Sequence, residues 1–367
     1  MKKIVTLLFM CIISVSAFSQ EVENQDKKLV FGGYGEVVYN QVEGANGFLD
    51  VLRFVMTMGY QFNDKVSFFT EIEYEHVVEL YVEQFYINYK VADNFNVKGG
   101  LLLVPMGIIN EYHEPNYFNG VERPAVDKNI VPTTWREIGA GISGKFDNIS
   151  LGYQLYVLNG FRSYNGTTGF IGGGNGLRGG RQRGASSTIN KPNFSAKVDY
   201  YAIQGLKLGL AGYVGRTQAT DNVDMIPGAD VGITMIGLDA RYNYNRFNAR
   251  GQYIYTDITD AADYNALTNK ALGSSMKGWY LETSYNLLPT EKEQELHAFT
   301  RYEIYDTHNT VEGSLVKNKA FDRNDLTFGL SYHVAKGAVV KTDYQIKDDA
   351  TNNSVKNQFN LGIGVVF

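Results

Sequence analysis

The sequence predicts an all-β protein, a 16-stranded antiparallel transmembrane β-barrel with short periplasmic turns and long external loops. Three observations support this prediction. Apolar and polar residues alternate with a period of two in sixteen segments, which is typical of strands with one apolar face. The connections between these segments are alternately short and long. The composition, with 39 glycines and 26 tyrosines but only 7 prolines, favours strands and turns over helices.

The N-terminus has the pattern of a cleaved export signal. Lys2 and Lys3 precede an apolar run over residues 4–15, and residues 17–19 form a small-x-small cleavage site. The run is shorter than the about 20 residues that a membrane-spanning helix needs. We therefore expect the following division of the chain: a signal peptide over 1–19, a short polar segment over 20–28 and the barrel over 29–367.

The strand pattern is clearest between Leu326 and Val334, where every even position is apolar and every odd position is not. Repeating this comparison along the chain predicts strands near 29–40, 48–60, 65–75, 80–90, 94–105, 134–146, 148–159, 193–203, 206–216, 231–244, 246–257, 277–287, 295–306, 324–335, 337–348 and 356–367. A soluble β-sandwich also shows alternation. An even number of strands with all long loops at one end fits an outer-membrane barrel better.

The last strand has a further signal. Phe359, Leu361 and Ile363 share a face with the terminal Phe367. An alternating strand with a terminal aromatic residue resembles the recognition signal of the outer-membrane insertion machinery. We therefore expect Phe367 to act as an insertion signal and the protein to lie in the outer membrane of a Gram-negative bacterium.

Sixteen strands enclose a lumen that side chains cannot fill, so an aqueous channel is expected. Basic residues predicted to line this channel and set its selectivity are Arg53, Lys98, Arg123, Lys128, Arg241, Arg250, Arg301 and Lys341. They could form a cationic track for an anionic solute, because guanidinium groups stay charged and offer forked donors. Alternatively, they pair with acidic residues across the wall in structural ladders.

The connection over 107–133 is the predicted constriction loop. Four of the seven prolines lie at positions 105, 115, 124 and 132, in or just before it, and their fixed φ angles stiffen it. A stiff loop that folds inward would narrow the lumen. The alternative is an external loop packed on its neighbours.

Motifs in and after this loop resemble the phosphate-selective porin O and P family. The similarity extends over about 40 residues, from Pro105-Met106-Gly107 to Trp135-Arg136-Glu137. It includes Glu111, His113, Glu122, Arg123, Pro124, Trp135, Arg136 and Glu137. The resemblance implies an outer-membrane porin, usually trimeric, whose inward third loop narrows the channel and whose basic residues guide anions.

The 160–191 connection is predicted to be a Gly/Arg-rich external loop. No Asp or Glu occurs between Asn148 and Val198, yet four arginines of this loop form an expected basic mouth: Arg162, Arg178, Arg181 and Arg183. Such a mouth would concentrate anions. Contact with the phosphate groups of lipopolysaccharide is the competing interpretation.

Several other function classes are excluded or disfavoured. The single cysteine, Cys11, lies in the predicted signal peptide, so disulfides and Cys-ligated metals are excluded. The five histidines show no metal-ligand spacing, and no nucleophile and base are recognisable, so we expect no metal, no cofactor and no enzyme activity. A net charge of −5 disfavours nucleic acid as a partner.

Two functions remain. The first is a passive diffusion channel for small hydrophilic solutes with a preference for anions. The second is a surface binding or adhesion barrel without an open channel. Expected partners are outer-membrane lipid and lipopolysaccharide, small anionic solutes, the insertion machinery and further copies of the chain in a homotrimer.

Overall fold

The computed structural model describes residues 28–220, 223, 225–351 and 355–367. The predicted signal peptide and nearly all of the short polar segment after it lie outside these residues.

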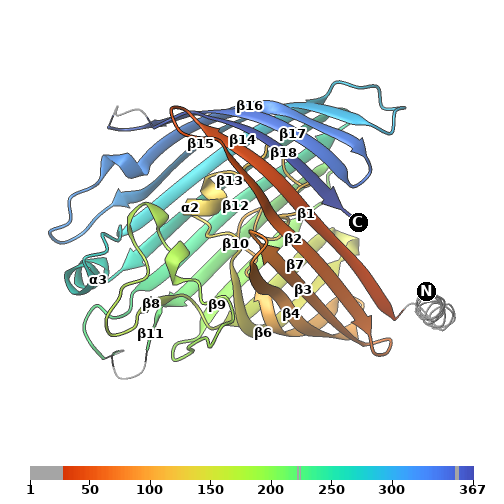
Figure 1. Ribbon diagram of the computed structural model, residues 1–367. Helices are drawn as coiled ribbons and strands as arrows, with labels where there is room; N and C mark the ends of the chain where they lie inside the picture. Colours follow the sequence, from red (N-terminus) through yellow and green to blue (C-terminus); the bar gives the residue numbers. More distant parts are fainter. Residues whose placement is uncertain (1–27, 221–222, 224, 352–354) are drawn as a thin grey trace, which may run out of the picture.

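Sixteen strands form one closed antiparallel barrel (Figure 1). Its strands are β1 Leu29–Val42, β2 Phe48–Gln61, β3 Val66–Glu75, β4 Glu79–Ala92, β5 Phe95–Leu103, β6 Arg136–Phe146, β7 Leu151–Leu158, β9 Asn193–Tyr200, β10 Leu206–Arg216, β12 Gly232–Tyr244, β13 Phe247–Thr259, β14 Ser275–Asn286, β15 Glu295–Thr310, β16 Asp322–Ala335, β17 Ala338–Asp349 and β18 Gln358–Val366. The predicted barrel fold and strand number are thus confirmed, with strand ends shifted by a few residues.

The barrel closes by pairing its first and last strands. β1 and β18 are antiparallel in a register that sets Tyr34 opposite Val366. Gly33 and Phe367 exchange two backbone hydrogen bonds of 2.9 Å. The Phe367 ring lies 6.4 Å from that of Phe54 on β2, so the terminal residue is part of the seam.

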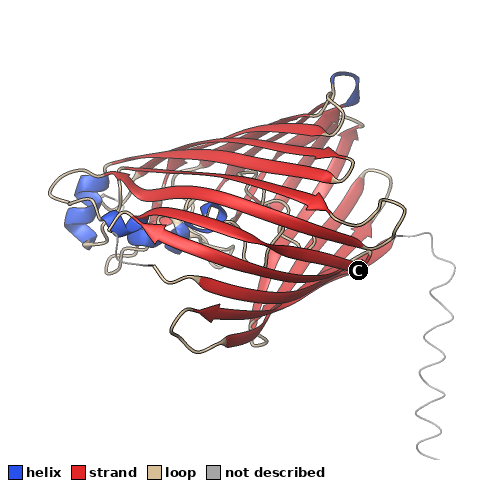
Figure 2. Ribbon diagram, turned by 90° about the horizontal axis from the view of Figure 1, so that it is seen from above, coloured by secondary structure: helices blue, strands red, loops and turns tan. Residues whose placement is uncertain are grey.

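The remaining elements are short and belong mainly to the connections. β8 Arg162–Tyr164 and β11 Gln218–Ala219 form a small parallel sheet, which two- and three-residue segments are too short to reveal by alternation. The helices are α2 Val126–Asn129 and α3 Ala261–Thr268, with 3-10 turns η1 Asp147–Ile149, η2 Gly173–Asn175, η3 Arg178–Gly180 and η4 Lys319–Phe321. Most of these helical segments gather at the end with the long connections (Figure 2). Within the described ranges, no helix is long and apolar enough to cross a membrane.

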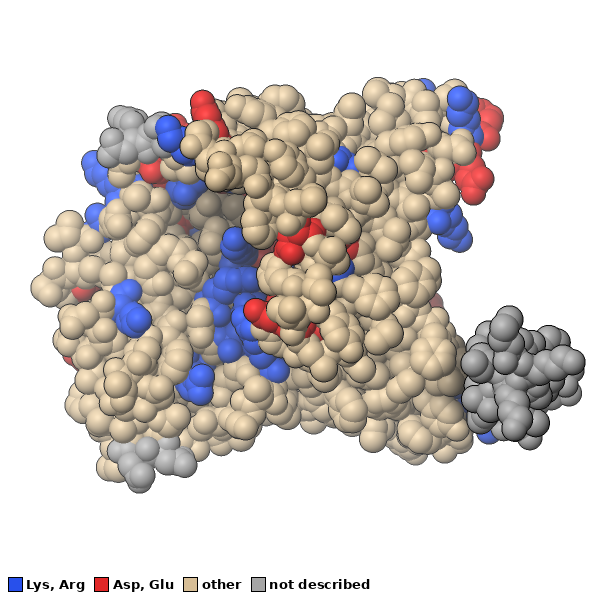
Figure 3. All heavy atoms as spheres, viewed as in Figure 1, with Lys and Arg blue, Asp and Glu red and all other residues tan. Residues whose placement is uncertain are grey.

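The two faces of each strand differ as the alternation predicts. On β10, Leu210 is 54% exposed on the outer wall, whereas its neighbour Ala211, which faces inward, is 3% exposed. Charged strand residues such as Arg53, Glu71 and Lys197 are buried inside. Across the outer wall seen in Figure 3, Lys, Arg, Asp and Glu are sparse, and they gather at the rims and in the hollow.

An apolar core fills part of the lumen. Trp135, just before β6, is fully buried, and its ring stacks on Phe161 at 4.6 Å and lies 4.7 Å from Tyr213 on β10. Its indole N–H donates to Glu137 Oε1 at 2.8 Å. The connections over 104–135 and 159–192 therefore pack together inside the barrel around this ring.

We expect Trp135→Ala to lower the free energy of unfolding by about 3–5 kcal/mol, because it opens a cavity and removes the apolar contacts of the indole. The chain has two tryptophans. Trp279 on β14 faces outward and is 37% exposed, so Trp279→Ala is the matched control and should have a smaller effect in detergent. Denaturant unfolding of both refolded variants measures the difference, and equal losses would contradict the internal core.

Candidate functional site

The connection between β5 and β6 crosses the lumen and is fixed to the far wall. Its residues hydrogen-bond to side chains on three strands from the second half of the chain, β13, β15 and β17: Ile108 N to Gln252 Oε1 at 2.9 Å, Tyr117 O to Arg250 Nη1 at 2.6 Å, Phe118 O to Lys341 Nζ at 2.8 Å, Val121 N to Asp343 Oδ2 at 2.6 Å, and Val126 N to Glu303 Oε2 at 3.2 Å. The 107–133 loop thus lies inside the barrel.

One glycine shows how tightly the loop is seated. Gly107 has a φ of +74°, where residues with a side chain are strained. A Cβ atom at this position would lie 2.9 Å from Asp127 Oδ1. Glycine therefore permits both the turn into the lumen and the close approach to α2.

Arg301 on β15 is the central anchor of the loop. Its side chain is 1% exposed and donates to Glu282 Oε2 at 3.2 Å and to Glu303 Oε1 at 3.1 Å. The same guanidinium donates to the carbonyl oxygens of Asn119 at 3.4 Å and Glu122 at 3.2 Å. Arg301 therefore neutralises two wall carboxylates and holds two loop carbonyls at once.

The other basic strand residues are engaged in similar ways. Arg53 pairs with Glu36 at 2.6 Å, and Arg250 pairs with Glu282 at 2.6 Å. The remaining three are also in contact: Arg241 lies 3.5 Å from Asp239 and 4.9 Å from the Tyr112 ring centroid, Lys98 lies 5.2 Å from the Tyr86 ring centroid, and Lys341 lies 3.9 Å from the Phe118 ring centroid. These contacts favour the structural alternative for the strand arginines.

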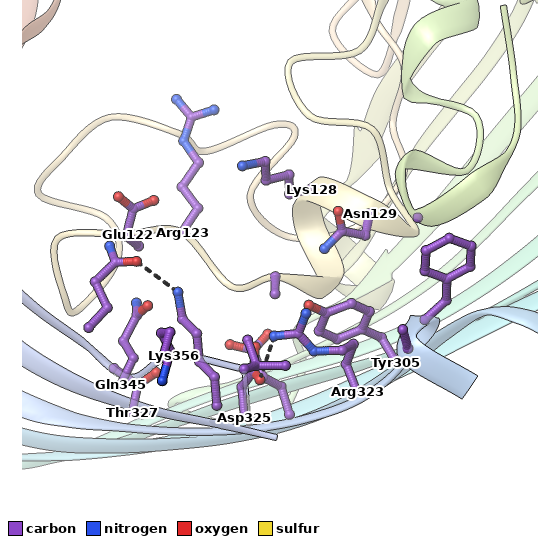
Figure 4. Close-up of a pocket in the computed structure, with 18 of the residues that line it drawn as sticks. Glu122, Arg123, Lys128, Asn129, Tyr305, Arg323, Asp325, Thr327, Gln345 and Lys356 are labelled. Atoms are coloured by element: carbon purple, nitrogen blue, oxygen red, sulfur yellow. Dashed lines mark hydrogen bonds and ion pairs between the residues drawn. The ribbon is translucent and has the colours of Figure 1, made fainter. Parts of the chain in front are cut away.

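Arg123 and Lys128, the two predicted cations of the 107–133 loop, differ from the strand arginines in their ion pairing. Among the described residues, neither Arg123 nor Lys128 has an ion-pair partner. Both line a cavity of about 600 Å³ between the loop and the wall formed by β15 to β18. Figure 4 shows both side chains directed away from the wall residues Arg323 and Asp325, which pair at 3.5 Å. Both also line a second cavity beside β1 to β3.

The four arginines of the 160–191 loop also lack acidic partners within the described part of the chain. Arg178 donates to Thr133 O, and Arg181 donates to Pro132 O at 3.2 Å. Burial, followed by the charges of Arg178 and Arg183, lowers the pKa of Arg181. Two of the four contact aromatic rings: Arg162 lies over Phe170 and Arg183 over Tyr81. Arg178 lines the same cavity as Arg123, so the basic loop reaches into the lumen.

The acidic and structural residues of the predicted motif hold the loop in place. Glu111 accepts from Lys197 Nζ and, at 2.6 Å, from Gln154 Nε2. Burial opposes its charge, but the charge of Lys197 and the hydrogen bonds from Lys197 and Gln154 together lower the pKa of Glu111. Three further motif contacts complete the fixation: Asn40 Nδ2 to Glu122 Oε1 at 2.8 Å, Asp127 N to Pro124 O at 3.0 Å at the start of α2, and Gly160 N to Glu137 Oε2 at 2.8 Å.

His113 brings the loop against β3 and β4. Its Nε2 lies 3.1 Å from Glu83 Oε2, and Arg136 Nη1 donates to Glu83 Oε1 at 3.2 Å. Burial disfavours charge on the imidazole, but hydrogen bonds and charge from Glu71 and Glu83 raise the pKa of His113 to about 9. The pocket around Nε2 therefore attracts positive charge.

Glu83 is a site residue that the sequence analysis missed. It is the extra residue of a β-bulge, because Glu71 pairs with Gln84 while Ile72 pairs with Val82. A bulge turns an additional side chain toward one face. The apolar positions of β4 change from even numbers before the bulge to odd numbers after it, and this change of parity is the signal that could have revealed Glu83.

The loop separates cavities at the two ends of the lumen. On the side of the short turns, a cavity of about 600 Å³ is lined by Tyr117, Phe118 and Arg241. Phe118 also lines the cavity beside β1 to β3, on the side of the long connections. Phe118 therefore stands between an outer and an inner cavity, next to the anchors Lys341 and Arg301.

The sequence was compared with family models and with known proteins. No family model matches the chain. A protein of Aquifex aeolicus (strain VF5), described as uncharacterized, is 31% identical over 360 residues, which cover 92% of this chain and 80% of that protein.

Solved structures of outer-membrane channels have a similar fold. The channel DcaP of Acinetobacter baumannii gives a TM-score of 0.61 at 12% identity, with 92% of this chain and 97% of that chain covered. The anion-selective porin from Comamonas acidovorans gives 0.57 at 13% identity, covering 92% and 99%. The trimer form of in-vitro folded OmpT of Vibrio cholerae gives 0.59 at 12% identity, also covering 92% and 99%. At these identities the likeness concerns the fold.

Proposed function

This chain belongs to the family of the Aquifex aeolicus protein, and from its porin-like barrel we propose that it is an outer-membrane porin. Small hydrophilic solutes diffuse through its lumen, with a preference for anions. The observation that carries the proposal is the contrast between the ion-paired strand arginines and Arg123, Lys128 and Arg178, which line the cavities and have no ion-pair partner among the described residues. Unpaired cations in a narrow lumen raise the local concentration of anions.

The apolar outer surface of the barrel is evidence that the protein inserts into a membrane. Its exposed side chains are apolar along successive strands, such as Leu210 on β10 and Leu238 on β12. A closed barrel leaves no unpaired strand edge, which the hydrocarbon layer requires. We therefore also propose that the chain is exported and cleaved after residue 19. The insertion machinery of the Gram-negative outer membrane then recognises Phe367.

The finer parts of the proposal concern the solute and the partners. Membership of the phosphate-selective porin O and P family would make phosphate a permeant anion, and the Comamonas acidovorans porin of similar fold is described as anion-selective. A homotrimer is proposed because a related fold occurs in a trimer form. Arg162 and Arg183, at the outer end of the basic loop, are proposed to contact lipopolysaccharide.

A surface binding or adhesion barrel is the second candidate. It is favoured by the apolar core around Trp135, which fills part of the lumen. The test is reconstitution of the refolded protein in planar bilayers under a salt gradient. Stepwise conductance with a reversal potential on the anion side supports the porin. A folded protein that gives no conductance would support the adhesion barrel instead.

The anion preference should depend on pH through Asp127 in α2. This carboxyl group is fully buried, lines the cavity of Arg123, and its Oδ1 accepts from Gln252 Nε2 at 3.0 Å. Burial raises the pKa of Asp127 to about 7, against the lowering effects of Gln252 and Arg250. The group is therefore neutral below pH 7 and negative above it.

We expect a stronger anion preference at pH 6 than at pH 8, measured by reversal potential. Asp127→Asn should hold the preference at its pH 6 level throughout this range. Asp349→Asn, at the outer end of β17, is the matched control and should leave the pH dependence intact. A variant Asp127→Asn with an unchanged pH dependence would assign the effect to another group.

A further inference from the structure

Three potential ligand atoms converge where the loop meets β3 and β4. His113 Nε2 lies 3.1 Å from Glu83 Oε2 and 3.8 Å from Glu71 Oε1, and all three atoms lie within 4.8 Å of one another. The three residues are at most 4% exposed. Ligand atoms about 2.1 Å from a tetrahedral metal ion are about 3.4 Å apart. The observed spacing is close to this value, so small side-chain movements would complete a coordination shell.

The other polar atoms of the three side chains are already held. His113 Nδ1 lies 3.3 Å from Asn110 O, Glu83 Oε1 accepts from Arg136 at 3.2 Å, and Glu71 Oε2 accepts from Gln84 at 2.6 Å. Metal-binding histidines commonly donate their second N–H to a carbonyl, and ligating carboxylates are commonly hydrogen-bonded through their second oxygen. His113 Nε2, Glu83 Oε2 and Glu71 Oε1 are directed toward one another, and Glu71 Oε1 also accepts from the Tyr34 hydroxyl at 2.7 Å, a contact that can persist when the same oxygen binds a metal.

The backbone is arranged to deliver Glu83 to this point. The bulge on β4 adds Glu83 as an extra residue, next to the Glu71–Gln84 pair. Bulges that redirect a side chain are frequent next to functional sites. Because of the bulge, Glu83 and Gln84 are consecutive residues that both face the lumen, so the Glu83 carboxylate lies beside the Glu71–Gln84 pair and within reach of His113.

The charges around the cluster also favour a cation. Glu73 lies within hydrogen-bonding reach of Glu83, which adds a third carboxyl group. Arg136 compensates one negative charge. Arg53 is already paired with Glu36 and donates to the His113 carbonyl at 2.6 Å. Glu71, Glu73 and Glu83 thus bring three carboxyl groups beside His113, and among the described residues Arg136 is the arginine that pairs with them.

We propose that His113, Glu71 and Glu83 bind a divalent transition-metal ion of the Zn²⁺ class, which fastens the lumen loop to β3 and β4. One imidazole and two carboxylates suit Zn²⁺, and a fourth position remains for water or Glu73. The charge of Arg123 reaches Glu83, but Arg123 contributes no ligand, so the existence of the metal site does not depend on the proposed channel function.

The test uses Co²⁺ as a spectroscopic probe on the full-length refolded protein in detergent, after chelator treatment. We expect one Co²⁺ per chain, with a visible absorption band of a four-coordinate site that Zn²⁺ displaces. His113→Gln and the isosteric Glu71→Gln should each weaken binding by about 100-fold or more, because each removes a direct ligand.

The matched control is His297→Gln. His297 lies 2.8 Å from Glu295 on β15, and within the described ranges this His–Glu pair belongs to no group of three potential ligands, so this variant should bind Co²⁺ as the unchanged protein does. Heat-modifiable migration on gels checks that each variant is folded. The proposal is overturned if the unchanged protein binds no Co²⁺ at millimolar concentration, or if folded Glu71→Gln binds it with unchanged affinity.

Discussion

Replacing Arg123 with glutamate is expected to shift the ion selectivity of the channel from anions toward cations. Arg123 has no ion-pair partner among the described residues and faces two cavities in the lumen. A change of two charges at about 7 Å alters the energy of a passing ion by roughly 1 kcal/mol even in water, with opposite signs for anions and cations. We therefore expect the anion-to-cation permeability ratio to fall by about tenfold or more.

Reversal potentials under a potassium chloride gradient measure this shift. Arg246→Glu is the matched control, because this substitution makes the same change of charge outside the lumen. The Arg246 guanidinium lies 4.9 Å from the centroid of the Tyr285 ring. The shift in Arg123→Glu should shrink at high ionic strength as the introduced charge is screened. An unchanged reversal potential in Arg123→Glu would mean that ions pass at a distance from the loop.

Replacing Arg301 with methionine should release the loop and destabilise the barrel. The variant leaves Glu303 buried without its cation and removes one of the two cations of Glu282. Breaking a buried ion pair by removing one partner typically costs about 3–5 kcal/mol. It also removes the donors to Asn119 O and Glu122 O, so the loop loses its central anchor.

We expect Arg301→Met to lower the free energy of unfolding by that amount and to give larger, noisier single-channel conductance. Arg301→Lys should have a stability and a conductance between those of the unchanged protein and of Arg301→Met, because lysine keeps the charge but not the forked geometry. Arg323→Met is the matched control, since Arg323 lies at the outer end of β16 and pairs with Asp325 at 3.5 Å. A stable Arg301→Met variant with unchanged conductance would show that other contacts suffice to hold the loop.

The barrel could be predicted from the sequence because the alternation of apolar and polar residues is a local pattern within each strand. Alternation between apolar and polar residues is enforced at every strand position by lipid on one side and water or protein on the other, so each strand shows its own pattern. The bulges at Leu52 in β2 and Glu83 in β4 were missed because each breaks this rule at one residue. Leu52 is skipped in the pairing of β1 with β2, as Glu83 is in the pairing of β3 with β4.

The apolar core in the lumen was missed for a related reason. Met235 on β12 and Ile254 on β13 face inward and are fully buried by the loops. In the sequence they stand beside outward-facing apolar residues such as Ile236, so both faces are apolar there and alternation is weak. A strand that is apolar on both faces indicates an internal packing partner, which was the available signal.

The roles of the cations depended on contacts that the sequence does not display. Arg301 lies directly opposite Glu282 in the β14–β15 register, and Arg53 lies opposite Glu36 in that of β1 and β2. Cross-strand neighbours of opposite charge attract each other, but the register must be known before they can be identified. Arg123 and Lys128 project from a loop, where no periodic rule gives the direction of a side chain.

The long reach of the lumen loop has a consequence for the order of assembly. Val121 bonds to Asp343, 222 residues further along the chain, and its neighbours bond to other late strands. These contacts can form only after the C-terminal strands are in place, so we expect this part of the loop to be fixed late in folding.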